Sequence, residues 1–372
     1  MDINFFVPTK IFTGKNCILN NSAVFAERGR KCIIVTGKNS AEKSGALCDV
    51  KTVLKTLGTE FLHYDGIEQN PSYETCKKAA ALAADFGAEY VIGIGGGSPL
   101  DAAKAVAVLA ADKNADEAKM YSCSWNFTPL PVIAVGITAG TGSEVTAVSV
   151  ITDSNGLKKS FRDERVYPAA AFGDPTYTMS LSEEFTRSTA VDALCHCVES
   201  YFNRTSNEIS RCFAVRGVQI LAEMLKKTAG KTELSYDDRE KLYCASLYGG
   251  LAISVTGTAF PHAMGYFLTE RHGIAHGSAC GAYFESFIEY NISVSPDEAK
   301  AFFDRVGTDA EKLCGLVRRN LSENVLKLKL TNDEIIEILP RFENNKSFKK
   351  CPGTADKILA QKILTKLFNQ KA

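Results

Sequence analysis

The sequence predicts two domains: an α/β domain with a doubly wound, mostly parallel sheet, followed by an all-α domain. Two observations lead to this prediction. In the first half of the chain, short runs rich in Val and Ile alternate with Ala-rich segments, which is typical of a sheet with helices on both faces. From about residue 180 onward, apolar residues recur at helical spacing and strand-like runs become rare. A chain of 372 residues accommodates two domains at roughly 150 residues each.

The expected elements follow in chain order. Runs with strand composition lie at 32–36, 60–63, 90–94, 132–135 and 148–152. Ala-rich helices are expected at 73–86 and 100–111. The second half carries helix-period segments at 182–201, 208–226, 237–251 and 296–321. The turn at Asp174 and Pro175 marks the boundary, so we expect domains of residues 1–178 and 179–372.

The charge balance excludes two classes of partner. The chain has 43 Lys and Arg against 43 Asp and Glu, so neither a nucleic acid nor a membrane surface would find an excess of basic charge. No stretch approaches the roughly 18 apolar residues of a membrane span, and the first residues lack the pattern of a secretion signal. The 12 cysteines are scattered without a C-x-x-C pair, which fits a reducing compartment. We therefore expect a soluble, cytoplasmic protein.

A glycine-rich loop follows the strand expected at 90–94. Residues 95–101 read GGGSPLD, in which Ser98 suits the N-cap, Pro99 the first position and Asp101 the first turn of a helix. Three glycines before a helix N-terminus let the backbone approach a pyrophosphate, whose charge the N–H groups and the helix dipole stabilise. A tight strand-to-helix turn without any ligand accounts for these residues equally well.

A second loop of small and hydroxyl-bearing residues favours the nucleotide-binding interpretation. Residues 138–146 read TAGTGSEVT and follow the strand expected at 132–135. Because the carboxyl ends of parallel strands meet at one edge of a sheet, the two loops are expected to share a crevice. The first domain is therefore predicted to be Rossmann-like and dinucleotide-binding, although its glycine spacing is not G-x-G-x-x-G.

Histidines gather in the second half of the chain. Of the 5 histidines, those between positions 196 and 276 are His196, His262, His272 and His276. Asp192 and His196 are four apart in an expected helix, so their side chains share a face. One carboxylate with three imidazoles, from His196, His262 and His276, suits Fe²⁺ or Zn²⁺ and disfavours Mg²⁺ or Ca²⁺. A satisfied structural histidine is the alternative for any one of them alone.

Three neighbours of His196 allow more than one interpretation. Cys195 and Cys197 flank it, but their spacing sends them to different helix faces, which favours buried packing over metal ligation. Glu199 lies seven residues after Asp192 on the same face. It is either a hydrogen-bond partner of a metal ligand or a member of a structural ion pair.

Together these motifs resemble those of the iron-containing alcohol dehydrogenases, the metal-dependent group also called group III. The resemblance runs through most of the chain. In the first half it rests on FVPTKIFTG at 6–14, Asn70–Pro71, IGGGSPLDAAK at 94–104, GTGSEVT at 140–146 and Asp174–Pro175. In the second half it rests on DALCHCVE at 192–199, PHAMGY at 261–266 and HGIAHG at 272–277.

The resemblance implies a cleft between the two domains in which a metal ion, Fe²⁺ or alternatively Zn²⁺, meets a nicotinamide. The metal ligands that it implies are Asp192, His196, His262 and His276. The cofactor contacts that it implies are Gly95, Gly96, Gly97, Ser98, Asp101, Thr138, Thr141, Ser143 and Lys158. It also implies a homodimer.

Two departures from the family pattern bear on chemistry. Tyr266 stands where many relatives have a histidine, four residues after His262, so His272 becomes the candidate that relays a proton. NAD-specific dehydrogenases commonly place an acid after the first strand to hold the ribose 2′-hydroxyl, whereas this chain has Gly37 and Lys38 there. Because Lys38 or Lys43 can meet a 2′-phosphate, we expect Gly37 and Lys38 to contact the cofactor and NADP to be preferred over NAD.

The expected reaction is hydride transfer between NAD(P)(H) and a small primary alcohol, such as butanol, or its aldehyde. A glycerol dehydrogenase or a dehydroquinate-synthase-like enzyme is the alternative, because such enzymes look similar in the glycine loop and the metal site. An alternative of a different class is a non-catalytic scaffold that binds metal and nucleotide.

Overall fold

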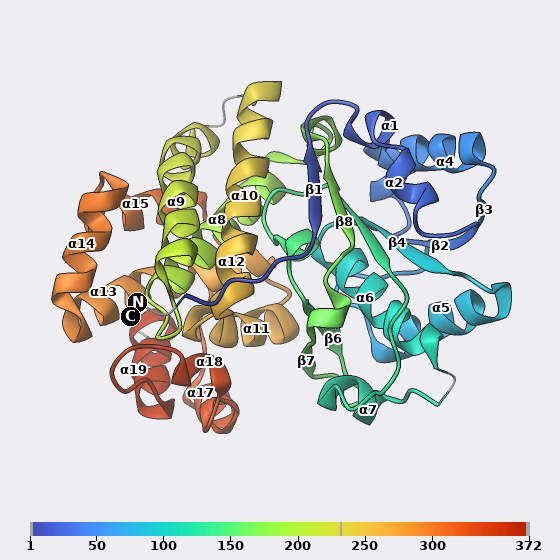
Figure 1. The fold of residues 1–372 in the computed structure, drawn as a ribbon. Coiled ribbons are helices and arrows are strands. Elements are labelled where there is room, and N and C mark those ends of the chain that lie inside the picture. Colours follow the sequence, from blue (N-terminus) through green and yellow to red (C-terminus); the bar gives the residue numbers. More distant parts are fainter. Residues whose placement is uncertain (1–2, 113, 231–232, 370–372) are drawn as a thin grey trace. The chain divides into compact units, whose positions relative to one another are not determined.

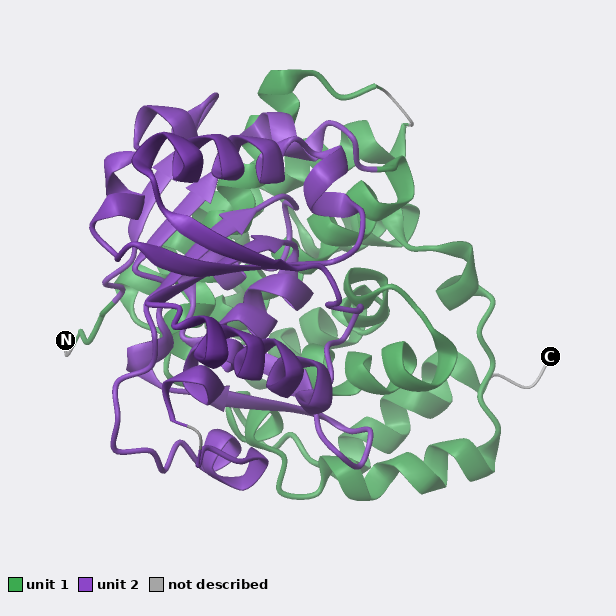
Figure 2. Cartoon of the chain, turned by 90° about the vertical axis from the view of Figure 1, so that its right-hand side faces the viewer, with its two compact units in different colours: residues 1–6, 182–372 green, residues 7–181 purple. Residues whose placement is uncertain are grey.

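The computed structural model describes residues 3–112, 114–230 and 233–369. The chain forms two compact units, coloured separately in Figure 2. The α/β unit comprises residues 7–181, and the helical unit comprises residues 182–372 with the first six residues. Asn207 Nδ2 donates a hydrogen bond of 3.1 Å to the Asn4 carbonyl oxygen, which ties the amino-terminal segment to the helical unit. The division falls after residue 181, whereas the sequence analysis expects it after residue 178.

The α/β unit is built on a six-stranded sheet with the order β1-β8-β5-β4-β2-β3 (Figure 1). Every neighbouring pair of strands in this sheet is parallel. Its strands are β1 (Lys10–Thr13), β2 (Lys31–Thr36), β3 (Glu60–Tyr64), β4 (Tyr90–Gly95), β5 (Val132–Gly136) and β8 (Ala170–Gly173). The predicted parallel sheet of a Rossmann-like domain is thereby confirmed.

The four inner strands, β8, β5, β4 and β2, are buried on both faces of the sheet, which explains why they are almost continuously apolar. Ile33 and Val35 of β2 point into one apolar cluster, together with helices α5 and α6, while Cys32 and Ile34 point into another with α1 and α4. The helices of this unit are α1 (Cys17–Asn20), α2 (Ala23–Ala26), α3 (Ser40–Lys43), α4 (Ala46–Leu57), α5 (Tyr73–Phe86), α6 (Gly97–Ala111) and α7 (Glu117–Ser122). Short 3₁₀ helices are η1 (Ser143–Val145), η2 (Glu164–Val166) and η3 (Pro175–Thr178).

The strand predicted at 148–152 exists but lies outside the large sheet. It forms β6 (Val148–Thr152) and pairs antiparallel with β7 (Lys158–Arg162) in a separate two-stranded sheet. The strands β1, β7 and β8 have no counterpart in the prediction. All three are only four or five residues long, and β1 and β7 are largely exposed, so they carry little apolar periodicity.

The glycine-rich loop differs from the prediction at three residues. Pro99 is the third residue of α6 rather than the first, and Asp101 lies beyond the first turn, which contains no acid. Helix α6 begins at Gly97 with Gly96 as its N-cap, so the predicted N-cap role of Ser98 is wrong. Ser98 already lies inside the first turn, where its Oγ accepts a hydrogen bond of 3.1 Å from the Asn70 N–H instead.

The helical unit confirms the predicted all-α second half. Its longer helices are α8 (Glu183–Tyr201), α9 (Glu208–Ala229), α10 (Tyr236–Thr256), α11 (Phe260–His272), α13 (Phe284–Val294), α14 (Pro296–Val306), α15 (Ala310–Asn320) and α19 (Lys357–Phe368). Shorter ones are α12 (His276–Gly281), α16 (Glu323–Leu326), α17 (Asn332–Ile338), η4 (Leu339–Phe342) and α18 (Lys346–Lys349). The single helix predicted at 296–321 is two helices, because Gly307 has φ 70° and ends α14. Within the described ranges, no helix combines the length and the apolar character that crossing a membrane requires.

Candidate functional site

Helix α8 supplies the first two residues of the predicted metal site. Asp192 and His196 lie four residues apart in its middle and are 3% and 5% exposed. His196 Nε2 is 4.0 Å from Asp192 Oδ1. The spacing of one helical turn thus places an acid and an imidazole side by side in a buried position, as the sequence predicts.

Two further helices bring the other predicted ligands to Asp192. His262 lies in the first turn of α11, and its Nε2 is 3.4 Å from Asp192 Oδ1. His276 is the first residue of α12, and its Nε2 is 3.9 Å from the same oxygen. The ring of His196 stacks on that of His262, with centroids 4.5 Å apart. The structure therefore gathers all four predicted ligands around one carboxylate oxygen.

Glycines allow these helices to approach so closely. A Cβ at Gly277 of α12 would overlap the carbonyl oxygen of Ser188 in α8. A Cβ at Gly281, one turn later, would lie 2.5 Å from Val191 Cγ1. On α11, a Cβ at Gly265 would lie 3.0 Å from Cys280 Sγ. Backbone contact at three glycines thus sets the distance between the helices that carry the imidazoles.

A sulfur atom belongs to the cluster as well. The ligand atoms of Asp192, His262, His276 and Cys280 all lie within 4.8 Å of one another. Cys280 is four residues after His276 on α12, and the sequence analysis does not identify it. The available signal was its helical spacing, which places it on the face of His276. His196 lies beside this group of four, against His262.

Glu199 is a hydrogen-bond partner of a predicted ligand. Its Oε1 accepts a hydrogen bond of 2.5 Å from His262 Nδ1, and its Oε2 accepts one of 2.6 Å from the Ala259 N–H. The glutamate thereby fixes the ring of His262 and leaves Nε2 facing Asp192. Of the two interpretations that the sequence leaves open, the geometry supports the first.

The electrostatics of the cluster favour a cation. Burial acts to raise the pKa of Asp192, but His196, His276 and His262 outweigh burial and hold this pKa well below its ordinary value of 3.8. For His262, burial acts to lower the pKa, but Cys280, Glu199 and Asp192 together raise it well above 6.5. Both directions show that negative charge gathered here is stabilised by positive charge.

The two predicted nucleotide loops lie side by side in the α/β unit. Gly95 at the end of β4 pairs with Gly136 of β5, so both loops leave the same edge of the sheet. A Cβ at Gly96 would lie 3.0 Å from Thr138 Cγ2, and one at Gly97 would lie 3.1 Å from Thr141 Cγ2. The absence of side chains on the glycines lets the two loops pack closely, and Gly96 and Gly97 remain partly exposed.

Asp101 and Ser143, both predicted to contact a cofactor, also hold this loop pair together. Asp101 accepts hydrogen bonds from Ser143 Oγ at 2.5 Å and from the Val150 N–H at 2.9 Å. Lys104, which is fully buried, donates to the Ser143 carbonyl oxygen at 2.8 Å and to the Val148 carbonyl oxygen at 2.7 Å. Helix α6 is therefore fastened to the loop that carries Thr141 and Ser143.

The remaining predicted cofactor residues lie at two places in the same unit. Gly37 and the exposed Lys38 follow β2, whose Thr36 pairs with Ile94 of β4. The neighbours of β2 in the sheet are β3 and β4, so the strand order reverses between β2 and β4, where ligands of such sheets bind. Lys158 begins β7, where it pairs with Thr152 of β6.

Comparison with known proteins identifies the family. Residues 8–175 match the family described as iron-containing alcohol dehydrogenase, and residues 186–333 match the carboxyl-terminal domain of the same family. The chain belongs to the iron-containing alcohol dehydrogenases.

Individual members of this family resemble the chain over most of its length. The 1,3-propanediol dehydrogenase of Citrobacter freundii is 28% identical over 319 residues, which are 84% of this chain and 79% of that protein. An NADPH-dependent butanol dehydrogenase of Clostridium saccharobutylicum is 29% identical over 79% of this chain and 75% of its own length. The crystal structure of an iron-containing alcohol dehydrogenase from Thermotoga maritima is 32% identical and superposes with a TM-score of 0.91 over 99% of both chains.

The buried polar atoms of the cluster fit the metal ion of an iron-containing alcohol dehydrogenase. Asp192 Oδ1 and His262 Nε2 are buried and have no hydrogen-bond partner. Leaving such an atom unsatisfied costs about 1–3 kcal/mol, and more where it is charged. A divalent cation accounts for both atoms at once, because a carboxylate oxygen and an imidazole nitrogen are ligands of Fe²⁺ and Zn²⁺.

His272 and Tyr266, which the departures from the family pattern single out, lie on α11. His272 ends the helix; its ring packs edge-on against Phe267 at 5.4 Å, and its Nε2 is 3.9 Å from Glu334 Oε1. The ring of Tyr266 stacks on the ring of His276, with centroids 5.7 Å apart and planes 11° apart. Tyr266 therefore contacts a predicted ligand, His276, in addition to lying one helical turn after His262.

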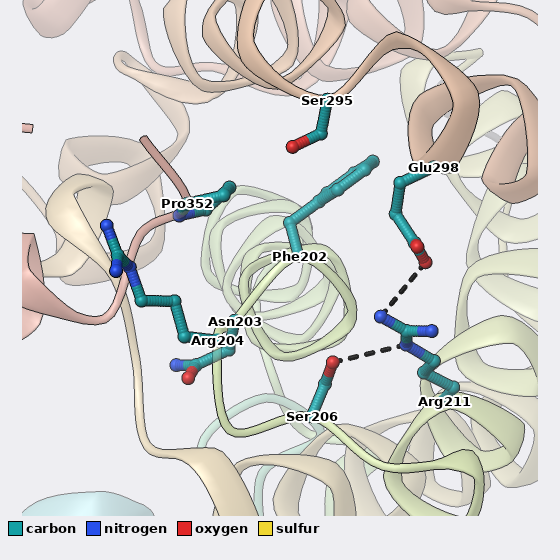
Figure 3. A pocket seen from close by; sticks show the side chains of 8 residues that line it. All are labelled: Phe202, Asn203, Arg204, Ser206, Arg211, Ser295, Glu298 and Pro352. Carbon is teal, nitrogen blue, oxygen red and sulfur yellow. Dashed lines mark hydrogen bonds and ion pairs between the residues drawn. The ribbon is translucent and has the colours of Figure 1, made fainter. Parts of the chain in front are cut away.

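A hollow of about 200 Å³ elsewhere in the helical unit is a weaker candidate for the functional site than the cluster around Asp192 (Figure 3). Its lining residues are Phe202, Asn203, Arg204, Ser206, Arg211, Ser295, Glu298 and Pro352. The charged side chains already have partners: Arg211 pairs with Glu298 at 3.0 Å, and Arg204 donates to the carbonyl oxygens of Cys351 and Gly353. The cluster around Asp192 is therefore the candidate site.

Proposed function

We propose that this protein reduces small aldehydes to primary alcohols, and catalyses the reverse oxidation, with a divalent metal ion and NADP(H). The observation that carries the proposal is the group of Asp192, His262 and His276, whose ligand atoms converge. Asp192 and His262 are buried, and each has a ligand atom without a hydrogen-bond partner. Membership of the iron-containing alcohol dehydrogenases supports the reaction class. Relatives named for 1,3-propanediol and butanol support a short-chain primary alcohol as substrate.

Some residues of the protein would hold the metal ion, and another would orient one of its ligands. Asp192, His196, His262 and His276 would hold the ion, and Glu199 would keep the ring of His262 in place. An ion bound there supplies a Lewis acid that polarises a carbonyl or hydroxyl oxygen. The loops at 95–97 and 138–141 would bind the pyrophosphate, so that the nicotinamide is presented to the substrate.

Proton exchange with solvent is proposed for His272. Its Nε2 is buried without a hydrogen-bond partner, while its side chain as a whole is 20% exposed. Imidazole is the side chain that most often serves in general acid–base catalysis. Glu334 Oε1, 3.9 Å from His272 Nε2, would help to orient the ring.

The proposed preference for NADP is argued from the residues that follow β2. No acid stands at Gly37, and a Cβ there would lie 3.2 Å from the Ile67 carbonyl oxygen, so the chain has little room for one. Lys38 and Lys43 are exposed and lie on either side of the start of α3. The relative described as NADPH-dependent supports the same choice. Removing a lysine that contacts a 2′-phosphate should weaken NADPH binding by roughly tenfold or more while leaving NADH unaffected.

The test is butanal reduction by anaerobically purified protein of known metal content. We expect oxidation of NADPH that is lost on chelation, is restored by Fe²⁺ or Zn²⁺, and is lost in Asp192→Ala and His276→Ala. Activity that survives chelation and both substitutions would falsify the mechanism. Turnover of glycerol in preference to butanol, or phosphate release from a sugar phosphate without net nicotinamide turnover, would instead identify a glycerol dehydrogenase or a dehydroquinate-synthase-like enzyme.

We further propose a cytoplasmic homodimer: the family resemblance implies the dimer, and the described cysteines form no disulfide, which fits a reducing compartment. Light scattering of the purified protein would give twice the chain mass of 40.4 kDa if the assembly is correct.

A further inference from the structure

Lys104 of α6 has its charged end entirely inside the α/β unit. Its side chain is 0% exposed, so its charge can act on a bound nucleotide only through other groups. Its Nζ donates hydrogen bonds to the carbonyl oxygen and the Oγ of Ser143, both at 2.8 Å, and to the Val148 carbonyl oxygen at 2.7 Å. It also lies 3.5 Å from Asp101 Oδ1. The proposed function assigns no role to this buried cation.

These contacts require the ammonium form of Lys104. The two carbonyl oxygens can only accept hydrogen bonds. Ser143 Oγ donates its own proton to Asp101 Oδ1 at 2.5 Å, so toward Lys104 it accepts as well. Three acceptors need three N–H donors, which an ammonium has and a neutral amine lacks. Burial lowers the pKa of Lys104 below its ordinary value, while Asp101 and Glu144 act in the opposite direction and favour the charge.

The ammonium is the centre of a network that joins three segments of the α/β unit. Ser143 belongs to the nucleotide loop at 138–146, and Asp101 belongs to the helix that follows the three glycines. The other Asp101 oxygen, Oδ2, accepts a hydrogen bond of 2.9 Å from the Val150 N–H of β6, the strand that also contains Val148. Without the ammonium, a carboxylate and two carbonyl oxygens would be left in this place with no positive charge, which favours displacement of the loop.

The position of this loop matters because it packs against the glycines with little space to spare. A Cβ at Gly96 would lie 3.0 Å from Thr138 Cγ2, and one at Gly97 would lie 3.1 Å from Thr141 Cγ2. Thr141 Oγ1 accepts a hydrogen bond of 3.3 Å from the Ser143 N–H. The threonine that faces Gly97 is therefore tied to the residue that the lysine holds.

We propose that Lys104 is a positioning residue for the cofactor: its ammonium holds the loop at 138–146 against the glycines at 95–97 in the arrangement that receives a pyrophosphate. This inference rests on the proposed function and adds a residue that acts on the cofactor without touching it. The metal ligands belong to the other unit. Loss of Lys104 should therefore change cofactor affinity and leave metal binding and the chemical step unchanged.

The test compares wild-type protein with Lys104→Met, which nearly keeps the length of the side chain and removes its charge. The probe is ADP-ribose, which contains the pyrophosphate of the cofactor but no nicotinamide, titrated into the full-length protein by calorimetry. We expect the Kd of ADP-ribose and the KM for NADPH to rise by roughly tenfold or more, because hydrogen bonds from a charged donor are lost. Zn²⁺ affinity and kcat at saturating NADPH should stay as in wild type. A folding defect alone would instead lower the active fraction, and so kcat, without changing KM or Kd.

The matched control is Lys78→Met. Lys78 is exposed on α5, a helix of the same unit that packs beside α6, and its replacement should leave both constants unchanged. Equal ADP-ribose affinity in wild type and in folded Lys104→Met would disprove the role of Lys104 and leave the proposed function standing. A wild-type protein that binds no ADP-ribose would disprove the proposed use of a dinucleotide, and this inference with it.

The wild-type protein provides a second measurement that does not depend on the folding of a variant. If the network holds the loop for the ligand, the ligand must by reciprocity stabilise the network. ADP-ribose should therefore slow hydrogen exchange of the Val150 amide, which is bonded to Asp101 and lies outside both loops. The Glu60 amide, bonded to the Arg30 carbonyl oxygen at the start of β3, should exchange at an unchanged rate. Exchange of the Val150 amide that is the same with and without ADP-ribose would overturn the proposal.

Discussion

At the scale of single residues, Glu199 shows how a carboxylate outside the proposed ligand set orients a proposed ligand, His262. It accepts the hydrogen bond of His262 Nδ1 while the backbone of Ala259 holds it in place. Glu199→Gln keeps the size of the side chain but removes one of two charge-assisted contacts. We predict a loss of metal affinity of roughly 10- to 100-fold, measured by competition with a chelator of known affinity.

The matched control for Glu199 is a glutamate on the same helix that has no part in the cluster. Glu183, at the start of α8, has a side chain 63% exposed and lies 3.9 Å from Arg187. Glu183→Gln should leave metal affinity unchanged, since exposed pairs contribute little. Equal affinities for wild type, Glu199→Gln and Glu183→Gln would show that Glu199 has only a packing role.

A second residue-scale prediction separates proton transfer from metal binding. His272→Gln removes an imidazole whose nearest charged neighbour is Glu334 rather than Asp192. We expect bound metal to stay at the wild-type amount and kcat for aldehyde reduction to fall by roughly 10²-fold or more, with loss of the corresponding limb in the pH profile. A retained kcat with an unchanged pH profile would show that another group transfers the proton. Tyr266, which is stacked on His276, would then be the next residue to replace.

The sequence identifies residues of this site when their spacing lies within one helix. Asp192 and His196 are separated by one helical turn, and His262 and His276 stand out because histidine is rare in the chain. Cys280 has the same spacing from His276, but with 12 cysteines in the chain its residue type carries little information. The role of Glu199 depends on the docking of α11 against α8, which no local pattern encodes.

At the scale of elements, the approach of α12 to α8 depends on a pair of glycines one turn apart. In Gly277→Ala the new methyl group would overlap the Ser188 carbonyl oxygen, which belongs to backbone and cannot move aside cheaply. We predict a loss of stability of about 1–3 kcal/mol and, because His276 moves away from Asp192, a loss of metal binding. Chemical denaturation and metal analysis of the same preparation would measure both.

Gly315 provides the control for this substitution. It lies within α15, and the nearest atom to a Cβ there is the end of the Arg319 side chain at 3.7 Å. Gly315→Ala should therefore be neutral or stabilise the protein by up to about 1 kcal/mol, through helix propensity. If Gly277→Ala and Gly315→Ala changed stability and metal binding equally, close contact between α8 and α12 would not be what positions His276.

Element boundaries were predictable where apolar periodicity was long, and not where elements are short or local signals compete. Helix α5 (Tyr73–Phe86) matches its prediction, and its Ser72 cap is formed. Within 296–321 the periodicity continues across Gly307, so one helix was expected, although the glycine and the N-cap Asp309 both mark the break. At Ser98 a favourable capping residue was overruled, because Gly96 adopts the extended backbone of the cap.

At the scale of the whole molecule, the predicted metal ligands belong to the helical unit and the glycine-rich loops to the α/β unit. Bound metal and bound NADPH should therefore each protect a different set of backbone amides from hydrogen exchange. A ligand at 100 times its Kd stabilises the state that binds it by about 2.7 kcal/mol, which slows exchange through local opening by about 100-fold. We predict that Zn²⁺ alone slows exchange in α8, α11 and α12, and that NADPH alone slows exchange at 95–101 and 138–146. If metal alone slowed exchange at 95–101 and left exchange in α11 unchanged, the assignment of the two sites to separate units would be contradicted.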